Sequence, residues 1–151
     1  MTLALVTGAS RGIGAACALA LARAGHDVAL HFRRDVNGAR ETAAAIEAAG
    51  GTAYLLAWDP ADDPVHLVEQ LPDVPDVAVL NAFPQDVRPW ADLTAADWDA
   101  MWSGGLRSTA LLLHTLTTTM ATGGSVVAVG SIEGLRPANG HAPYAVAKAA
   151  E

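Results

Sequence analysis

Short apolar runs alternate with longer, alanine-rich segments along most of this chain. The apolar runs predict strands at residues 3–7, 27–32, 52–58, 76–82 and 124–131. The segments between them predict helices at 12–24, 37–49, 62–71, 94–102 and 106–121, and a last helix from residue 142 onward. Strands and helices that alternate in this way indicate βαβ units with parallel strands and right-handed crossovers. Because the strands are continuously apolar, helices are expected to cover both faces of the sheet.

These elements predict an α/β fold with a doubly wound parallel sheet, Rossmann-like, in the strand order 3-2-1-4-5. The 151 residues have the length of one domain, so we expect residues 1–151 to form a single dinucleotide-binding domain. In such a sheet the ligand crevice lies at the carboxyl ends of the strands. Candidate functional residues should therefore follow strands rather than precede them.

The helical region in the middle of the chain carries its own start and stop signals. Thr94 is the expected N-cap of the helix 94–102, with Asp97 in the capping-box position. Gly104 and Gly105 follow, and each glycine costs a helix interior roughly 1 kcal/mol relative to alanine. We therefore expect the helix to bend or break at this glycine pair and to resume at residue 106.

Composition and charge exclude several classes of protein. Hydrophobic residues make up 52% of the chain and charged residues 17%, which excludes an intrinsically disordered protein. The sequence has no run of 18 or more apolar residues, so no membrane-spanning helix is predicted. Its amino-terminus lacks the basic segment that begins a secretory signal. Cys17 is the only cysteine, so no internal disulfide is possible, and no metal-ligand spacing is present. These features predict a soluble, cytoplasmic protein without a bound metal.

The net charge of −7 is unevenly distributed. Residues 1–50 carry a balance of +1, whereas residues 51–151 carry −8. The acidic part is interpreted as a solubilising surface. A nucleic-acid-binding protein would carry a basic stripe, and this sequence has none. The basic cluster within residues 1–50 is the part of the chain that could contact an anion.

The segment TGASRGIG at residues 7–14 leaves the first predicted strand and opens the first helix. Its glycines allow a tight turn, a close backbone approach to a pyrophosphate and close packing of helix on strand. The helix amino-terminus adds unpaired N–H groups and a partial positive charge. In this position the segment predicts a dinucleotide site. The loop residues predicted to bind the cofactor are Gly8, Ser10, Arg11, Gly12, Ile13 and Gly14.

The end of the second strand indicates which dinucleotide binds. An acidic residue there would bind the ribose 2′-hydroxyl of NAD, whereas arginine suits the 2′-phosphate of NADP. Here the strand ends at Phe32, and Arg33 and Arg34 follow, with Arg11 able to converge on the same point. This favours NADP(H) over NAD(H). Two alternatives stay open, namely that the arginines are only solvated turn residues and that Asp35 binds the ribose.

Tyr144 and Lys148 lie four residues apart near the end of the chain, so a helix places both side chains on one face. Tyrosine is a weak acid at neutral pH, and a neighbouring ammonium group stabilises its phenolate and suits it to general acid catalysis. Ser131 follows the fifth strand at the expected ligand edge. Glu133 and His141 border the same region, where a solvated loop position is the simpler interpretation.

Together these segments resemble the short-chain dehydrogenase/reductase family, and the resemblance covers the whole chain. The segment 7–14 resembles the cofactor loop of the family, LNAF at 80–83 its NNAG motif, and residues 130–148 its catalytic segment. The sequence looks most similar to 3-oxoacyl-carrier-protein reductases and related NADPH-dependent ketoreductases. The resemblance implies an NADPH-dependent oxidoreductase that reduces a ketone or 3-oxoacyl group by hydride transfer.

The resemblance also implies roles for individual residues. Tyr144 would protonate the carbonyl oxygen, Ser131 would hydrogen-bond that oxygen, and Lys148 would hold the nicotinamide ribose and tune the tyrosine. The catalytic residues are thus Ser131, Tyr144 and Lys148. Beyond the glycine loop, the implied cofactor-binding residues are Arg33, Asp59, Asn81, Tyr144 and Lys148.

Two departures from the family pattern stand out. Gly105 occupies the position of a family asparagine that supports a water relay to the lysine, and this puts the proton supply to Lys148 in question. The chain also stops at Glu151, about a hundred residues before family members do, so the usual carboxyl-terminal strands of the sheet are expected to be missing. These departures motivate a second hypothesis, a catalytically silent nucleotide-binding fragment or a partner subunit of a larger assembly.

The early stop also leads to an expectation about partners. Without a sixth strand, residues 125–130 would present an unpaired apolar edge, and such an edge invites pairing with another chain. We therefore expect a homo-oligomer, or a second chain that supplies the missing part, besides a small-molecule carbonyl or acyl substrate.

Overall fold

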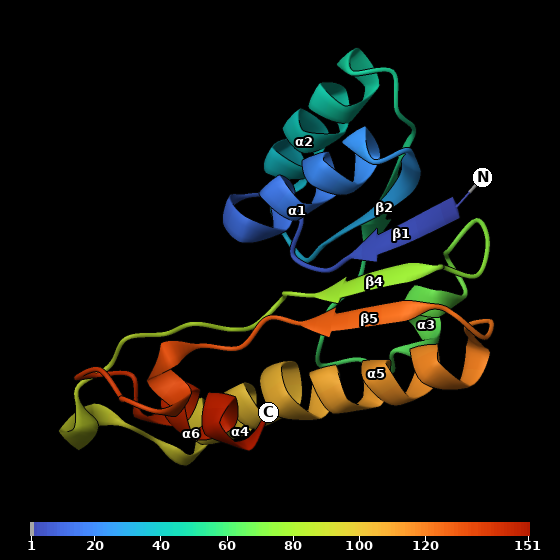
Figure 1. Cartoon of the computed structure of the whole chain (residues 1–151). Coiled ribbons are helices and arrows are strands. Elements are labelled where there is room, and N and C mark those ends of the chain that lie inside the picture. The colour runs from blue at the N-terminus through green and yellow to red at the C-terminus, as the bar shows by residue number, and fades with distance from the viewer. Residues whose placement is uncertain (1) are drawn as a thin grey trace.

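The structure is a computed structural model and describes residues 2–151. Its centre is a five-stranded parallel sheet in the order β3-β2-β1-β4-β5 (Figure 1). The prediction of the fold class and of the strand order is confirmed. The strands are β1 (Thr2–Val6), β2 (His26–Phe32), β3 (Ala53–Ala57), β4 (Val77–Leu80) and β5 (Ser125–Ala128).

Helices cover both faces of this sheet, and two more lie beyond its carboxyl edge (Figure 1). One face carries α1 (Gly12–Arg23) and α2 (Val36–Ala48), and the other carries the short α3 (Val65–Val68) and α5 (Ser108–Thr119). The helices α4 (Ala95–Met101) and α6 (Ala142–Ala150) lie past the ends of β4 and β5 and contact each other. Two short 3-10 turns, Trp90–Asp92 and Ile132–Gly134, lie in the connecting loops.

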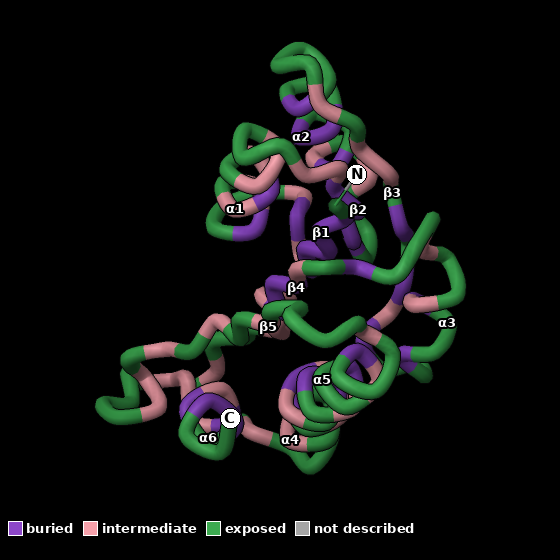
Figure 2. The backbone as a smooth tube through the Cα atoms, turned by 45° about the vertical axis from the view of Figure 1, so that its right-hand side comes forward, coloured by how far each residue is buried: buried purple, intermediate pink, exposed green. Residues whose placement is uncertain are grey.

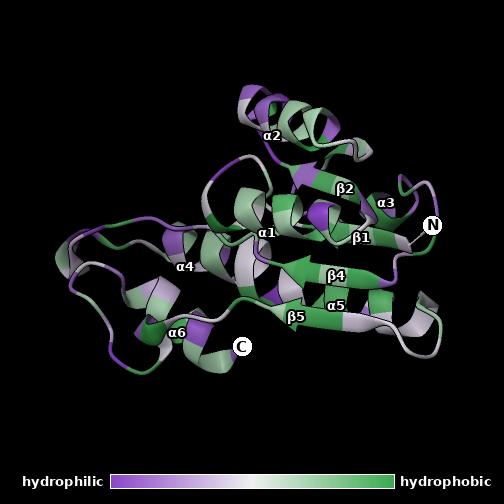
Figure 3. Ribbon diagram, turned by 45° about the horizontal axis from the view of Figure 1, so that its top comes forward, coloured by the Kyte–Doolittle hydropathy of each residue, from purple (hydrophilic) through white to green (hydrophobic). Residues whose placement is uncertain are grey.

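The alternation of side chains along each strand builds two separate cores. Leu5 points to the α3 and α5 face, where it packs with Leu112 and Leu116. Val6 points to the opposite face, where it packs with Ala18 and other small residues of α1 and α2. Small alanine side chains bring these helices close to the sheet, and the strands stand out as the hydrophobic part of the molecule (Figure 3). Burial is greatest in the central strands (Figure 2).

The strand β5 lies at one edge of the sheet and pairs with β4 through the register Val77↔Ser125 to Leu80↔Ala128. Three of its four residues are exposed, and Val127 retains 54% of its accessible surface. Figure 2 shows this contrast with the buried strands β1 and β4. An apolar strand this exposed has an open hydrogen-bonding edge, the kind that favours pairing with another strand.

One expectation about the helices is wrong, and a second holds only in part. The predicted helix at 62–71 is reduced to the four residues of α3, because Pro64 disfavours helix in the residues before it and Pro72 does the same in the residues that follow α3. At Gly104 and Gly105 the regular α-helix gives way, as expected, but the chain stays helical. A wider, π-helical turn (η2, Trp102–Arg107) joins α4 to α5 without interruption, so tertiary packing overrides the poor helix propensity of the two glycines.

Within residues 2–151, no helix combines the length and the apolar character that crossing a bilayer requires. Over the same described range, His, Cys, Asp and Glu side chains form no group of three that could hold a metal ion.

Candidate active site

A cleft of about 600 Å³ opens at the carboxyl ends of the central strands. Its walls come from the loop after β1, the end of β2 and the segment after β4, which the strand order brings together at one edge. The volume lies in the range of small-molecule and cofactor sites. Seven of the residues predicted to bind a cofactor line this cleft: Gly8, Ser10, Arg11, Gly12, Ile13, Arg33 and Asn81.

The glycine loop forms the floor of the cleft through a backbone conformation that side chains would prevent. Gly8 has a φ of +65°, in the left-handed region where residues with a Cβ are strained. A Cβ on Gly14 would collide with the carbonyl oxygen of Gly8 and would lie 2.7 Å from the Asn81 amide nitrogen. Gly14 does not itself line the cleft. Its missing side chain lets α1 begin directly against the loop.

A bracket of hydrogen bonds from β4 holds the glycine loop in place. The Thr7 hydroxyl oxygen accepts the backbone N–H groups of Asn81 and Ala82, at 2.8 Å and 2.9 Å. In return the Asn81 side-chain amide donates to the carbonyl oxygens of Thr7 (3.0 Å) and Gly8 (3.3 Å). Asn81 thus acts on the shape of the loop as well as lining the cleft. Sequence reasoning missed Thr7, although this residue opens the motif at 7–14.

His31 was also missed, and it supports the loop from the side of β2. Its side chain is 1% exposed and lies edge-on to Trp58, with ring centroids 5.3 Å apart. The backbone N–H of Gly8 donates to Nδ1 at 3.2 Å, so Nε2 carries the proton and donates to the Trp58 carbonyl oxygen at 3.0 Å. A histidine inside a predicted apolar strand is the sequence signal that could have drawn attention to it.

Burial lowers the pKa of His31, while the bond to the Trp58 carbonyl and the charge of Asp59 act in the opposite direction. The folded protein therefore keeps His31 neutral at pH values where the unfolded chain binds a proton. Stability should decline as the pH falls below the ordinary value of 6.5 toward the lowered pKa. A proton on Nδ1 would also break the bond from Gly8, so dinucleotide binding should weaken in the same window.

We expect the melting temperature of His31→Gln to depend less on pH than that of the wild type between about pH 7 and pH 5.5, a window above the ordinary titration of carboxylates. The check is a series of thermal unfolding curves across this window. His114→Gln, which changes an exposed histidine of α5, serves as the matched control and should follow the wild type. A His31→Gln variant with the same pH slope as the wild type would contradict the assignment.

The basic side chains gather at the end of β2, where Arg33 and Arg34 line the cleft together with Arg11 from the glycine loop. The Arg33 Nε atom lies 3.3 Å from the Asp59 carboxylate, and both side chains are 42% exposed. Asp59 is thus paired with Arg33 at the rim of the cleft instead of lining it. The Asp35 carboxylate accepts the Gly38 N–H at 3.0 Å and caps α2.

The three predicted catalytic residues lie together beyond the carboxyl end of β5, but outside the cleft lining. Ser131 follows β5, and its hydroxyl oxygen accepts the backbone N–H of Glu133 at 3.2 Å. Tyr144 and Lys148 lie on α6, which packs against α4 and η2. Among the described residues, no hydrogen bond joins the Ser131, Tyr144 and Lys148 side chains to one another.

Lys148 is the most enclosed of the three, with 3% of its side chain exposed. Its ammonium group donates to the Val129 carbonyl oxygen at 2.7 Å and to the Glu151 carboxylate at 2.5 Å. The same group lies 3.8 Å from the centroid of the Phe83 ring. Phe83 in turn lies edge-on to Tyr144, with ring centroids 5.6 Å apart. Phe83 lines the cleft, so it connects the cleft to the pair on α6.

Glu133 and His141 form a partly buried pair beside Tyr144, not two solvated loop residues. The His141 Nδ1 atom lies 2.8 Å from the Glu133 carboxylate, and each side chain is 16% exposed. The His141 ring also lies edge-on to Tyr144, with centroids 6.3 Å apart. The pair therefore places a charged and a polar side chain beside the Tyr144 ring.

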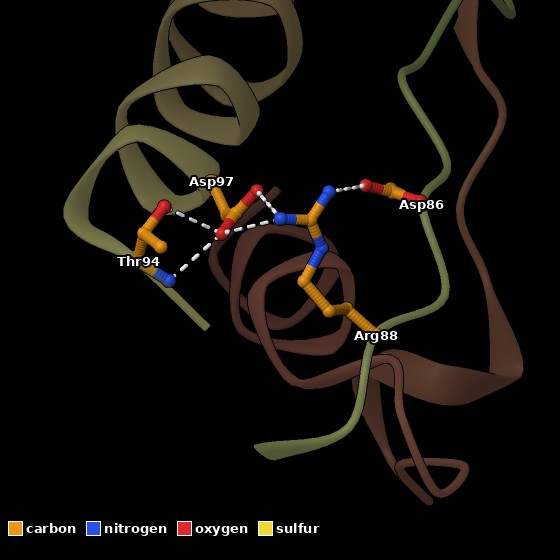
Figure 4. Close-up of polar contacts among 4 residues, drawn as sticks. All are labelled: Asp86, Arg88, Thr94 and Asp97. Carbon is orange, nitrogen blue, oxygen red and sulfur yellow. Dashed lines mark hydrogen bonds and ion pairs between the residues drawn. The ribbon is translucent and has the colours of Figure 1, made fainter. Parts of the chain in front are cut away.

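A charged network fixes the loop after β4 relative to α4 and α6 (Figure 4). Arg88 bonds to Asp97 (3.0 Å) and Asp86 (3.2 Å), and its backbone N–H donates to the Gly140 carbonyl. The predicted capping box is confirmed, because the Thr94 side chain accepts the Asp97 backbone N–H and the Asp97 carboxylate accepts the Thr94 N–H and also the Thr94 hydroxyl. The two hydrogen bonds that the carboxylate accepts from Thr94, with the charge of Arg88, lower the pKa of Asp97. The network therefore holds through the neutral range and weakens only in acid.

Comparison with known proteins places this arrangement among dehydrogenases. A family model described as short chain dehydrogenase matches residues 2–151. The hydroxynaphthalene reductase of Aspergillus fumigatus is 31% identical over 154 aligned residues, which cover 98% of this chain and 56% of the relative. A 3-oxoacyl-[acyl-carrier-protein] reductase of Aggregatibacter actinomycetemcomitans is 32% identical, with 96% of this chain and 63% of the relative covered.

Solved structures agree with this placement. A 3-oxoacyl (acyl-carrier-protein) reductase from Agrobacterium tumefaciens with NADP bound superimposes with a TM-score of 0.90 at 37% identity. The match covers 99% of this chain and 60% of that structure. The chain therefore spans roughly three fifths of the length of the relatives that it matches.

Proposed function

The chain belongs to the short-chain dehydrogenase family, and from that premise we propose that it takes part in the NADPH-dependent reduction of a ketone or 3-oxoacyl group. The observation that carries this proposal is the cleft, which is lined by the glycine loop held by Asn81 and by three arginines. The similar reductase from Agrobacterium tumefaciens has NADP bound. The wall of the cleft reaches Tyr144 and Lys148 through Phe83.

The residues of the cleft fit a phosphorylated dinucleotide. A Cβ at Gly8 or Gly14 would crowd Asn81, so both positions need glycine for the tight turn that lets the backbone approach a pyrophosphate closely. The amino-terminus of α1 lies beside this turn and favours an anion. Arg33 and Arg34 after β2 and Arg11 in the glycine loop line the cleft, where their positive charges would hold a 2′-phosphate. Asp35 already caps α2, which makes it a poorer ligand for the ribose.

In this proposal the reacting residues are Tyr144, Ser131 and Lys148. When NADPH is bound, its nicotinamide supplies the hydride. The Tyr144 hydroxyl donates the proton that the carbonyl oxygen of the substrate gains, and Ser131 donates a hydrogen bond to that oxygen. The buried ammonium of Lys148 lies one helical turn from Tyr144 on α6, where it would hold the nicotinamide ribose. Glu133 and His141 border the substrate beside the tyrosine ring.

One set of contacts favours the second candidate, a catalytically silent nucleotide-binding chain. Lys148 is occupied by Val129, Glu151 and Phe83, and none of the three catalytic candidates lines the cleft. In that case the chain would bind the dinucleotide without turning it over, and a second chain would complete the site.

Two measurements on the purified chain separate these functions. NADPH binding is followed by the fluorescence of the cofactor, and its oxidation is then followed with a panel of simple ketones and 3-oxoacyl esters. Oxidation that depends on a carbonyl compound supports the reductase. Tight binding without turnover of any member of the panel supports the silent chain. A chain that binds neither NADPH nor NADH would overturn both proposals.

The arginines of the cleft lead to a prediction about cofactor choice. We expect the double variant Arg11→Ala, Arg33→Ala to bind NADPH about tenfold or more weakly, because a charge-assisted hydrogen bond contributes about 1.5–3 kcal/mol. NADH lacks the 2′-phosphate, so its dissociation constant should change little. Titration of both cofactors by fluorescence measures the two constants.

The matched control is the double variant Arg23→Ala, Arg40→Ala. It removes the same charge from exposed positions on α1 and α2, away from the cleft. This control should bind both cofactors as the wild type does. Equal weakening of NADPH and NADH in the double variant at Arg11 and Arg33 would show that these arginines act on the fold and not on the phosphate.

A further inference from the structure

We propose that Phe83 is a positioning residue that fixes the Lys148 ammonium group and the Tyr144 ring, and that Gly105 is required because it makes the space for Phe83. The role in catalysis rests on the reductase function proposed above. The packing itself does not, and it is tested separately below.

The first observation is the fit between Phe83 and Gly105. A Cβ added to Gly105 would lie 2.8 Å and 2.9 Å from two carbon atoms of the Phe83 ring, closer than such contacts are found. Gly105 is buried in the π-helical turn η2, and Gly104 of the same turn also lines the cleft. The aromatic ring therefore occupies the volume that a side chain at position 105 would need. The packing of Phe83 therefore explains why position 105 carries a glycine, although glycine is a poor helix former.

The second observation is what the ring contacts on its other sides. The Lys148 ammonium lies 3.8 Å from the ring centroid, within the range of a cation–π contact. The Tyr144 ring meets Phe83 edge-on, with an interplanar angle of 88°, the arrangement that aromatic pairs favour. Because the Lys148 side chain is 3% exposed, little water competes for its charge. A desolvated ammonium gains most from an aromatic face.

The third observation is the position of Phe83 between two parts of the site. Phe83 lines the cleft, whereas Tyr144 and Lys148 do not. A ligand bound in the cleft would therefore contact the Phe83 ring, and the same ring contacts Tyr144 and Lys148 on α6. Polar partners hold two sides of the ammonium, namely the Val129 carbonyl and the Glu151 carboxylate, and the ring holds a third.

The fit between Phe83 and Gly105 is tested by a double-mutant cycle on thermal stability. Gly105→Ala alone should lower the melting temperature by about 3–10 °C, because overpacking forces the ring to move. In a Phe83→Gly background the same change should be neutral or stabilising, since alanine is the better helix former. Equal effects of Gly105→Ala in both backgrounds would overturn the proposed fit.

The contact with the ammonium has a spectroscopic signature, because Lys148 is the only lysine in the sequence. Protein labelled with ¹³C-lysine gives one set of lysine resonances, and protons above an aromatic face shift upfield. We expect this upfield shift of the Lys148 ε-protons in the wild type and in Phe83→Tyr, and its loss in Phe83→Leu. Ordinary chemical shifts in the wild type, or shifts unchanged in Phe83→Leu, would overturn the proposal.

The role in catalysis is tested by steady-state kinetics of the same variants, with the carbonyl compound that the wild type reduces fastest. Phe83→Leu should lower kcat about tenfold while the KM for NADPH changes little, and Phe83→Tyr should recover most of kcat. A kcat unaffected by Phe83→Leu would overturn the positioning role. If the wild type reduces no carbonyl compound, the proposed function fails. The lysine resonances and the stability cycle then still decide whether Phe83 holds Lys148.

Discussion

Tyr144→Phe is expected to lower kcat for carbonyl reduction by about 10²–10⁴-fold, the usual contribution of a positioned general acid. The variant removes the only hydroxyl proposed to donate a proton to the substrate oxygen and keeps the ring. Phe83 and His141 both contact Tyr144 through this ring, so the packing of α6 should survive. The measurement is the initial rate of NADPH oxidation at saturating carbonyl substrate.

The sequence offers a matched control, because Tyr54 is its only other tyrosine. Tyr54 lies on β3 and packs against the core on the α3 and α5 face, far along the sheet from α6. Tyr54→Phe should therefore retain the rate of the wild type. NADPH affinity should be nearly the same in both variants, because the hydroxyl of Tyr144 does not line the cleft. Turnover that survives Tyr144→Phe would remove Tyr144 from the proposed mechanism.

The sequence predicted the sheet and the glycine turn before α1 well because both depend on local patterns. Continuously apolar strands separated by amphipathic helices leave few topologies, and the observed order 3-2-1-4-5 is the expected one. The glycines of segment 7–14 are separated by few residues, so the turn and the start of α1 are visible in the sequence itself. The capping box of Thr94 and Asp97 is local in the same sense.

The supports of the site could not be predicted, because they join residues far apart in the chain. The bonds from Asn81 to Thr7 and Gly8 span more than seventy positions, and the bond from Gly8 to His31 spans 23. No pattern within either segment indicates such a partner. The lowered pKa of His31 follows from burial, which depends on the completed sheet.

Gly105 shows how a sequence pattern can locate a disturbance in a helix without predicting its form. Taken alone, two consecutive glycines predict a broken helix, since each carries a cost in propensity. The structure keeps the helix continuous through a π-helical turn, and the Phe83 ring fills the space beside Gly105. Phe83 and Gly105 therefore belong to one packing arrangement. A sequence read one motif at a time treats them as two unrelated losses.

The largest expected effect on cofactor binding comes from a single methyl group at position 14. Gly14→Ala places a Cβ against the carbonyl oxygen of Gly8 and 2.7 Å from the Asn81 amide nitrogen. The backbone of the glycine loop and its hydrogen bonds with Asn81 must then move. Overpacking of this kind lowers the free energy of unfolding by about 1–3 kcal/mol. We expect the melting temperature to fall by about 3–10 °C and NADPH to bind about 10- to 100-fold more weakly.

Gly130→Ala is the matched control, because a Cβ at Gly130 meets no atom within 4 Å and its backbone has no positive φ. This variant adds the same methyl group close to the same edge of the sheet and should bind NADPH as the wild type does. Thermal unfolding and cofactor titration measure both variants. If Gly14→Ala bound NADPH with the affinity of the wild type, the loop would tolerate a wider spacing from α1. The close contact between Gly14 and the Gly8 carbonyl would then not determine the shape of the cleft. If Gly130→Ala weakened NADPH binding by the same factor, the effect would come from any added methyl group at the carboxyl ends of the strands and not from Gly14 in particular.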